Sequence, residues 1–332
     1  MKKQFDDPNS NDVDCVDFAL ANRPKTPMKN CLNSPSMTSK YLPNDETVHQ
    51  FRVEQKLQQQ LIKQVQALSG NDRCADCSTN KEVPTWLSTN LGVLVCIECS
   101  GIHRDLGVHI SRIQSLTLDH ITTSQLMIAH NMGNDFFNEV YEAKLQSTKG
   151  PVNDSAQVNG SCDMMKLEAD STMEQRCDYI RKKYLHKTFC QVMHQDNIER
   201  RKSLECAVVN KDLKLLVQLL GEGFDLASCI QEETQETSIH LALKCQKASR
   251  DDASIQFECD LYILDFIIQN SRAIDKQNLS AETPLHYAAK FNLPECMKLL
   301  LKSGADVGAV NSGGETPMDV VKSLNSDEQI QT

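Results

Sequence analysis

The sequence predicts a mainly α-helical protein in which a small metal-stabilised module is followed by a stack of helical repeats. Two Cys-x2-Cys pairs lie between residues 74 and 99 and are separated by eighteen residues. Near the carboxyl terminus, Glu282–Ala289 is followed 33 residues later by a similar segment, Glu315–Val321. Apolar residues before these segments recur mostly at helical spacing. Together these features favour two α-rich domains in one chain of 332 residues.

The two cysteine pairs have the spacing of a structural zinc site. The pairs Cys74/Cys77 and Cys96/Cys99 each offer two thiolates on a tight turn. Four sulfurs complete a tetrahedral site for one zinc ion. Such a site has no open position for water, so we expect the metal to build the fold and to take no part in hydrolysis.

The residues around the second pair carry a resemblance to a known family. The motifs are Pro84–Gly92, Cys96–Arg104, Leu106–His109 and Ser115–Asp119. Together they resemble the zinc-dependent GTPase-activating domain that acts on Arf-type small GTPases, most closely the branch with SH3, ankyrin and pleckstrin-homology modules. The resemblance covers about residues 55–145 and, more loosely, 200–325. It implies an α-helical module with a small zinc-stabilised sheet, and a role in membrane trafficking and the actin cytoskeleton.

Arg104 is the candidate catalytic residue. GTP hydrolysis spreads negative charge over the γ-phosphate oxygens, and a planar guanidinium from a partner protein can stabilise that charge through paired hydrogen bonds. By resemblance, Arg104 matches the family's arginine finger, a group that contributes roughly 10³–10⁵ in rate. The GTP, the Mg²⁺ and the water-orienting glutamine would belong to the expected partner, an Arf-family GTPase.

The resemblance also implies a GTPase-binding surface around Arg104. Its expected members are Trp86, Ile102, His103, Leu118 and Asp119. Trp86 lies beside the finger in the family, with packing against the cysteine pairs as an equal alternative. Ile102 and His103 would set the angle of the arginine, contact the GTPase or fill space. We expect His109 and His120 to be structural or exposed, because the sequence identifies no partner for either.

The cysteine spacing departs from the family pattern. The eighteen residues Ser78–Val95 separate the inner cysteines, where the family usually has about sixteen. The surplus falls in Ser78–Val83, and closing the longer polar loop costs on the order of 0.1–0.5 kcal/mol. The metal site should therefore persist, while a longer loop beside Trp86 would weaken or re-tune GTPase recognition. The alternative function is a non-catalytic zinc and ankyrin adaptor that binds Arf or other proteins.

The composition and charge of the chain limit the classes of partner and the cellular location that we expect. A net charge of −10 argues against nucleic acid as a partner and against avid binding to anionic lipid. The cysteine spacing is close to that of GATA-type DNA-binding fingers, but those need a basic segment after the second pair, and Ser100–Gly107 is nearly neutral. No run of about eighteen apolar residues is present, and the start of the chain has no apolar signal core. We expect a cytoplasmic protein that reaches membranes peripherally, only through partners.

The chain order predicts six segments. They are a disordered tail (1–48), the zinc module (49–145), a flexible insertion (146–173), a closing helix and linker (174–200), the repeats (201–325) and a second tail (326–332). The first tail is polar and too short for the pleckstrin-homology domain that normally precedes the zinc module. Within the module, helices are expected over 49–68, from the capping pair Thr122 and Gln125 to His130, and, with Asn134 as the cap, through about Lys144.

A basic helix is expected at Tyr179–Tyr184. The resemblance places a similar helix at the close of the family's zinc domain. Its lysines and arginines would contact an acidic GTPase or a lipid headgroup, or form an ordinary solvated face.

The last third carries the internal repeat. Its 33-residue period and the Thr283-Pro284-Leu285-His286 sequence are typical of ankyrin repeats. A weaker copy at Glu236–Leu243 is displaced by thirteen residues, which we assign to a loop insertion at 246–258. An earlier unit, Leu204–Leu226, lacks the signature, as an end unit often does. The stack would brace the zinc module or recruit a protein partner, and the sequence does not favour either.

Overall fold

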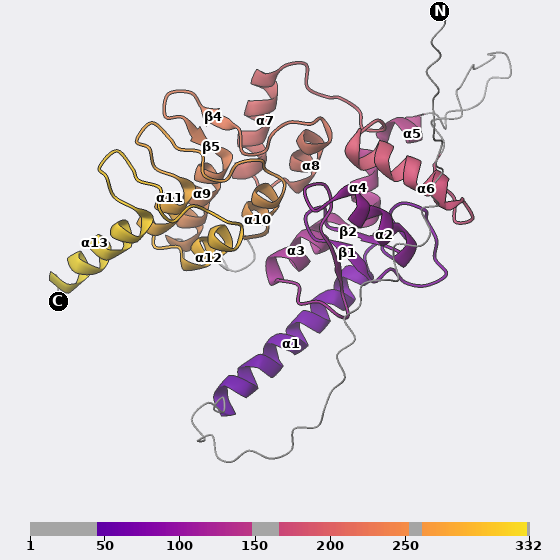
Figure 1. Cartoon of the computed structure of the whole chain (residues 1–332), viewed down its shortest axis with the longest axis horizontal. Helices are drawn as coiled ribbons and strands as arrows, with labels where there is room; N and C mark the ends of the chain where they lie inside the picture. Colours follow the sequence, from indigo (N-terminus) through magenta and orange to yellow (C-terminus); the bar gives the residue numbers. More distant parts are fainter. Residues whose placement is uncertain (1–44, 148–165, 252–260, 331–332) are drawn as a thin grey trace, which may run out of the picture. The chain divides into compact units, whose positions relative to one another are not determined.

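Helices dominate the computed structural model, which describes residues 45–147, 166–251 and 261–330 (Figure 1). Three short strands form a sheet in the first half of the chain, and helices follow one another in pairs in the second half. The chain from Phe51 to Thr332 forms one unit. Within the described ranges, no helix is both long and apolar enough to cross a membrane. The predicted mainly α fold with a small sheet is confirmed.

A small antiparallel sheet lies at the centre of the first half. The elements here are α1 (Asp45–Gln66), β1 (Trp86–Ser88), β2 (Val93–Val95), α2 (Ile97–Leu106), β3 (Ile113–Ser115), α3 (Thr123–Met132), α4 (Asn134–Tyr141), α5 (Ala143–Ser147), α6 (Met173–Ile180) and the π-helical turn η2 (Arg181–Leu185). The strand order is β2-β1-β3. Successive strand residues face opposite sides of a sheet, so Leu87 and Leu94 pack with residues of α1 and α3, while Val93 and Val95 join the core around the cysteines.

The turn between β1 and β2 requires glycine. Gly92 has φ +73°, and a Cβ added there would lie 2.9 Å from Cβ of Met132 and 3.0 Å from Cγ2 of Ile128. Both the backbone conformation and the close approach of α3 exclude a side chain. This turn fixes the path of the chain from Trp86 to the second cysteine pair.

The predicted capping pair is confirmed, but the role expected for Asn134 is not. Oγ1 of Thr122 accepts a hydrogen bond from the Gln125 backbone nitrogen, and the Gln125 side chain accepts one from the Thr122 nitrogen at 3.0 Å. Asn134 is the first residue of α4 and not its cap. Its buried side chain joins separate segments instead, donating to the backbone oxygens of Arg73 at 2.8 Å and Leu94 at 3.0 Å. The helix that starts here ends at Tyr141, and α5 follows as a separate short helix.

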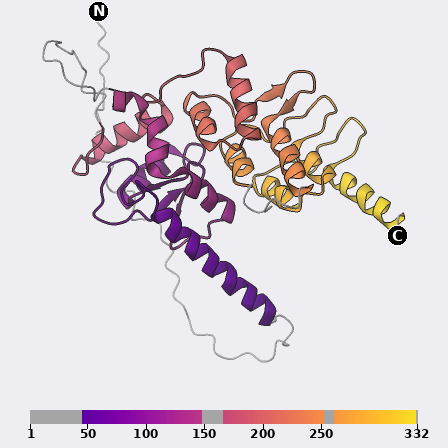
Figure 2. The ribbon, with the colours of Figure 1, turned by 180° about the vertical axis from the view of Figure 1, so that it is seen from behind.

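Helix pairs build the second half of the chain. The elements are α7 (Asn197–Val209), α8 (Leu213–Gly221), β4 (Cys229–Gln231), β5 (Glu236–Thr237), α9 (Ser238–Asp251), α10 (Leu261–Gln269), α11 (Pro284–Lys290), α12 (Pro294–Lys302) and α13 (Pro317–Ile330). Both views show α7, α9 and α11 succeeding one another in chain order (Figures 1 and 2). The first part of the predicted loop at 246–258 is instead helical, because α9 continues to Asp251. Residues 252–260 lie outside the described part of the chain.

Two histidines make equivalent contacts between successive repeats. Nδ1 of His240 accepts a hydrogen bond from the Thr237 backbone nitrogen at 3.2 Å, and Nε2 donates to the Glu282 backbone oxygen at 3.1 Å. His286 repeats the arrangement, and its Nε2 donates to the Glu315 oxygen at 3.0 Å. Each buried imidazole therefore ties the start of its own helix to the next repeat.

The repeats pack directly against the sheet-containing module. Helix α10 contacts α3, and α8 contacts α4. Helix α10 is apolar nearly all round and buried, as expected for a helix with neighbours on several sides. Polar contacts cross the same interface: Asn90 and Asn270 exchange hydrogen bonds of 3.0 and 2.7 Å, and Ser124 donates to Asp265 at 2.5 Å. Bracing of the module by the repeats is thus a feature of the structure.

Candidate functional site

Four cysteine sulfurs come together where the loop after α1 meets the start of α2. The Sγ atoms of Cys74, Cys77, Cys96 and Cys99 all lie within 4.8 Å of one another, and none of these cysteines is in a disulfide. Cys96 immediately precedes α2, and Cys99 lies in its first turn. The fold therefore joins the two predicted pairs into one cluster at the amino-terminal end of α2.

The cluster has the dimensions of a closed metal site. The Sγ atoms of Cys77 and Cys96 are 3.8 Å apart, and a tetrahedral zinc–thiolate site with bonds of about 2.3 Å places its sulfurs roughly 3.8 Å apart. The buried guanidinium of Arg176 donates to Cys99 Sγ at 3.7 Å and pairs with Glu98 at 3.4 Å. A positive group beside the sulfurs offsets part of the negative charge that four thiolates bring. The donor set thus fits a single zinc-like ion with no open position.

Helix α2 carries Arg104 away from this cluster and into solvent. Arg104 lies five residues after Cys99, which is about 7.5 Å along a helix axis, in the last turn of α2. Its side chain is exposed, and the guanidinium carbon lies 4.8 Å from the centre of the Trp86 ring. A cation at the carboxyl end of a helix and over an indole face is electrostatically favoured. The helix is therefore anchored at one end by the cysteines and presents a guanidinium at the other.

Two residues predicted for the binding surface are inside the module. His103 is 0% exposed and Ile102 is 5% exposed. Nε2 of His103 lies 2.9 Å from Asp76 Oδ2, and Nδ1 lies 2.7 Å from Ser111 Oγ. Side chains with this little accessible surface offer a partner protein almost nothing to contact, so neither residue belongs to an exposed binding surface. They face inward because they lie on the side of α2 that packs against the core, whereas Arg104 lies on the other side.

Leu118 and Asp119 occupy an exposed turn next to Trp86. Trp86 pairs with Ser115 across the sheet, and the turn follows Ser115 directly. Leu118 is 81% exposed, while Asp119 accepts a hydrogen bond from the Ser115 backbone nitrogen at 2.7 Å. The carboxylate of Asp119 thus shapes the turn that displays Leu118. His109 and His120 are exposed as well.

A buried ion network supports the first cysteine loop. Nζ of Lys183 lies 3.1 Å from Asp76 Oδ1, 2.8 Å from Glu142 Oε1 and 2.7 Å from Asn138 Oδ1. Burial by itself would lower the pKa of Lys183, but the Glu142 and Asp76 carboxylates outweigh it and raise that pKa above its ordinary value. Burial likewise raises the pKa of Asp76, and Lys183 and His103 reverse this and hold it well below its usual range. Both charges are therefore retained inside the module.

The sequence interpretation missed this network. It assigned the basic residues of Tyr179–Tyr184 to a partner-facing or solvated helix face, but Lys183 is 0% exposed. A signal was available, because Lys183 lies four residues after Tyr179 and three after Ile180, on the same helical face as two core residues. Asp76, between the first two cysteines, carried no comparable signal.

The Asp76–His103–Ser111 contacts have the order of a serine hydrolase triad. The three residues are at most 1% exposed, and Ser111 Oγ is also bonded to Ser88 Oγ at 2.8 Å. A nucleophile must be reachable by its substrate. The arrangement is therefore structural, and it offers no route to hydrolysis by this chain.

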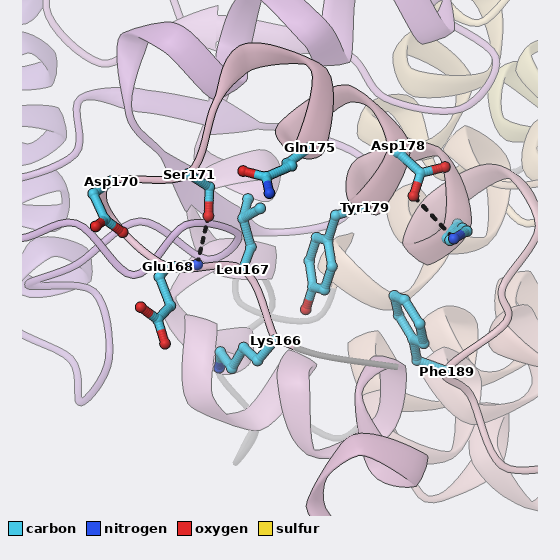
Figure 3. A pocket seen from close by; sticks show the side chains of 10 residues that line it. Lys166, Leu167, Glu168, Asp170, Ser171, Gln175, Asp178, Tyr179 and Phe189 are labelled. Atoms are coloured by element: carbon cyan, nitrogen blue, oxygen red, sulfur yellow. Dashed lines mark hydrogen bonds and ion pairs between the residues drawn. The ribbon is translucent and has the colours of Figure 1, made fainter. Parts of the chain in front are cut away.

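A hollow of about 590 Å³ lies beside α6, separate from Arg104 (Figure 3). It is lined by Lys166, Leu167, Glu168, Asp170, Ser171, Gln175, Asp178, Tyr179, Lys182 and Phe189. Its two lysines pair with carboxylates at 2.9 Å, Lys166 with Glu142 and Lys182 with Asp178. The hydroxyl of Tyr179 also donates to Glu142, at 2.7 Å. Both lysines and the tyrosine hydroxyl at this hollow are thus engaged with the protein itself.

Comparison with known proteins identifies two regions. Residues 59–193 match the family described as "Putative GTPase activating protein for Arf", and residues 267–321 match "Ankyrin repeats (many copies)". The ADP-ribosylation factor GTPase-activating protein AGD3 of Arabidopsis thaliana is 31% identical over 259 residues, which are 74% of this chain and 30% of that protein. The Arf-GAP with coiled-coil, ANK repeat and PH domain-containing protein 2 of Oryctolagus cuniculus is 30% identical over 256 residues, 76% of this chain and 30% of that protein.

Among solved structures, the ArfGap domain of HIV-1 Rev binding protein is similar with 17% identity and a TM-score of 0.34, covering 43% of this chain and 94% of that one. The chain spans about 30% of the length of the two curated relatives.

Proposed function

Since the chain contains an ArfGap domain followed by ankyrin repeats, we propose that it stimulates GTP hydrolysis by an Arf-family small GTPase. The GTPase would provide the nucleotide, the Mg²⁺ and the attacking water, and this chain would provide Arg104. The observation that carries the proposal is the exposed guanidinium at the end of a helix whose start lies in the cysteine cluster. The chain is therefore proposed as a regulator of a GTPase and not as a hydrolase acting alone.

One zinc ion, held by Cys74, Cys77, Cys96 and Cys99, would complete the module. When bound it supplies cohesion between the first cysteine loop and α2, and its four thiolate ligands leave no position for a catalytic water. The chemistry then depends on side chains outside the cluster.

Arg104 would stabilise charge that develops during hydrolysis. As the bond to the γ-phosphate breaks, negative charge increases on the phosphoryl oxygens and the leaving oxygen. A guanidinium offers several N–H donors in one plane, so it matches these oxygens better than a lysine ammonium does. In the free chain this group is held over Trp86, which limits the conformations that it must give up on reaching the nucleotide.

The proposed docking surface consists of Trp86, Leu118 and Asp119 beside Arg104. Leu118 is a large apolar side chain held in solvent by an ordered turn, a feature typical of protein-binding sites when it lies next to an aromatic and an arginine. The ankyrin repeats would offer a separate surface for another protein. Contact with membranes would be peripheral and would occur through these partners.

A single-turnover assay tests the proposal. Arf-family GTPases loaded with GTP on liposomes would be mixed with the wild-type chain, with Arg104→Lys, and with Arg250→Lys as a matched control at an exposed arginine of the repeats. We expect Arg104→Lys to lower the stimulated rate by roughly 10³–10⁵ and Arg250→Lys to leave it near the wild-type value. Binding to the GTP-loaded GTPase should survive in both variants.

The alternative is a non-catalytic adaptor. The Ser78–Val83 loop holds the residues by which the spacing between the inner cysteines exceeds the family's usual spacing. Lys81, Glu82 and Val83 of this loop are exposed, which is compatible with altered GTPase recognition. If neither the wild-type chain nor Arg104→Lys stimulates hydrolysis, only the adaptor is left.

A further inference from the structure

A continuous series of hydrogen bonds passes through His103, the residue before Arg104. It links Asp76, His103, Ser111, Ser88 and Asn90 by buried bonds and ends at Asn270 with a partly buried one. The link from Asp76 to His103 is 2.9 Å, from His103 to Ser111 2.7 Å, and from Ser111 to Ser88 2.8 Å. Ser88 lies 3.2 Å from Asn90 Oδ1, and Asn90 Nδ2 donates to Asn270 Oδ1 at 3.0 Å. This hydrogen-bond series thus joins the first cysteine loop, α2, the sheet and the ankyrin repeats.

The first half of this series fixes the rotation of α2. His103 is wholly buried and both ring nitrogens are bonded, one to the cysteine loop and one to the segment before β3. Adjacent residues on a helix differ in direction by about 100°, so holding His103 inward also sets the direction in which Arg104 leaves the helix. The imidazole edge also packs against Tyr184, with ring centres 4.6 Å apart. The side chain has little room to reorient.

The second half of the series ends in the repeats. Asn270 follows α10, and its Nδ2 donates to the Asn90 backbone oxygen at 2.7 Å while its Oδ1 accepts from Asn90 Nδ2. Asn90 Oδ1 accepts from the Arg112 backbone nitrogen at 2.9 Å, directly after Ser111. Buried polar groups are costly to leave unpaired. Without Asn270 the Asn90 backbone oxygen loses its donor. Asn90, whose Nδ2 also donates to the Ile110 backbone oxygen at 3.0 Å, can then shift and loosen the segment that holds Ser111 against His103.

We propose that His103 is a positioning residue for Arg104, and that Asn270 of the ankyrin repeats completes the hydrogen-bond series that holds His103 in place. This inference rests on the proposed function, because it assigns Arg104 the role of the finger. It gives the repeats a part in the stimulated reaction beyond the recruitment of a separate partner. His103 itself does not touch the GTPase or its nucleotide.

The test measures whether His103 acts through Arg104. His103→Ala would be compared with His103→Gln, whose amide can still donate to Asp76, in the wild-type chain and in an Arg104→Lys background. At saturating activator we expect His103→Ala to lower the rate by roughly 10- to 100-fold with little change in affinity for the GTP-loaded GTPase. His103→Gln should recover part of the loss, and His103→Ala should lower the rate no further in the Arg104→Lys background.

The possible results separate the two proposals. If the wild-type chain does not stimulate hydrolysis, the proposed function fails, and if Arg104→Lys is as fast as a stimulating wild-type chain, the role of Arg104 fails; in either case this inference fails with it. If Arg104→Lys is slow but His103→Ala has no effect, or has the same effect in both backgrounds, only the positioning role fails. Zinc content and the thermal midpoint would be measured for each variant, because a merely structural role lowers the rate in proportion to the folded fraction.

If His103→Ala loses its zinc or fails to fold, variants at the ankyrin end of the hydrogen-bond series test the proposal instead. Asn270→Ala removes the last residue of the hydrogen-bond series. Ser124→Ala is the control, because it removes a contact with Asp265 across the same interface and leaves the series intact. We expect Asn270→Ala to slow the stimulated reaction several-fold and Ser124→Ala to leave it unchanged. Equal rates for the two variants would overturn the proposal.

Discussion

The Arg104 guanidinium lies over the indole of Trp86, with 4.8 Å between the guanidinium carbon and the ring centre. The two side chains come from different elements, since Trp86 begins β1 and Arg104 lies in the last turn of α2. Such a contact is worth about 0.5–2 kcal/mol, depending on how far it is desolvated. It keeps the arginine side chain extended on one face of the module, where a partner can reach it.

Replacing Trp86 should slow the stimulated reaction. We expect Trp86→Ala to reduce the rate of GTP hydrolysis by roughly 2- to 30-fold through loss of the contact with Arg104. Trp86→Phe should lie closer to wild type, because it retains an aromatic face. Single-turnover rates at equal zinc content would measure the difference. A Trp86→Ala chain as active as wild type would show that the guanidinium needs no aromatic support.

One zinc ion per chain should be required for folding of the module. Cys96→Ser removes a sulfur from the cluster, so we expect loss of bound zinc and of helical circular dichroism. Cys206→Ser changes an exposed cysteine outside the cluster, and it should retain one zinc ion per chain. Metal analysis of the purified proteins gives the stoichiometry. Zinc retained at full stoichiometry in Cys96→Ser would contradict the four-sulfur site.

Lys183 should be far more important for stability than its neighbour Lys182. Lys183→Met removes the buried ammonium shared by Asp76 and Glu142 and leaves Glu142 only the more accessible Lys166 as an ion-pair partner in the described part of the chain. Breaking a buried ion pair costs about 3–5 kcal/mol. Lys182→Met removes a more accessible pair with Asp178, and it should cost about 1 kcal/mol or less. Urea unfolding at saturating zinc measures both values. Equal losses for the two variants would refute the role assigned to the buried network.

The contribution of His240 should depend on pH. Burial lowers the pKa of His240 below its ordinary value, although hydrogen bonding to the Glu282 backbone oxygen and the nearby Glu236 and Glu282 carboxylates act in the opposite direction. Because the unfolded chain binds the proton more tightly, the stability from His240 is fully present above about pH 6.5 and decreases as the pH falls below that value. Protonation also removes the Nδ1 acceptor used by Thr237.

A comparison with His240→Gln isolates this effect. Glutamine does not titrate, so the difference in free energy of unfolding between wild type and the variant should be largest near pH 7.5, at about 1–3 kcal/mol, and smaller near pH 5.5. Denaturant unfolding at the two pH values provides the measurement. A difference that grows on acidification would reverse the sign and contradict a neutral, buried imidazole.

Much of the architecture followed from local patterns. The cysteine spacing predicted the cluster because two tight turns can supply a tetrahedral site wherever the fold brings them together. The capping pair Thr122 and Gln125 and the repeated Thr-Pro-Leu-His sequence also predicted their helices, since both depend on contacts within a few residues. The Asn134 prediction was wrong because its side chain bonds to distant backbone at Arg73 and Leu94, which no local pattern reveals.

The sequence by itself determined the class of fold, the four sulfurs and the arginine five residues after the last of them, because each depends on residue type and short-range spacing. Only the tertiary structure decided which neighbours of Arg104 are accessible. It buried His103 against Asp76 and Lys183 between two carboxylates, and it bonded Asn270 of the repeats to Asn90 beside the sheet. Those contacts join residues far apart in the chain, and burial of a polar side chain depends on which partners the folded core supplies.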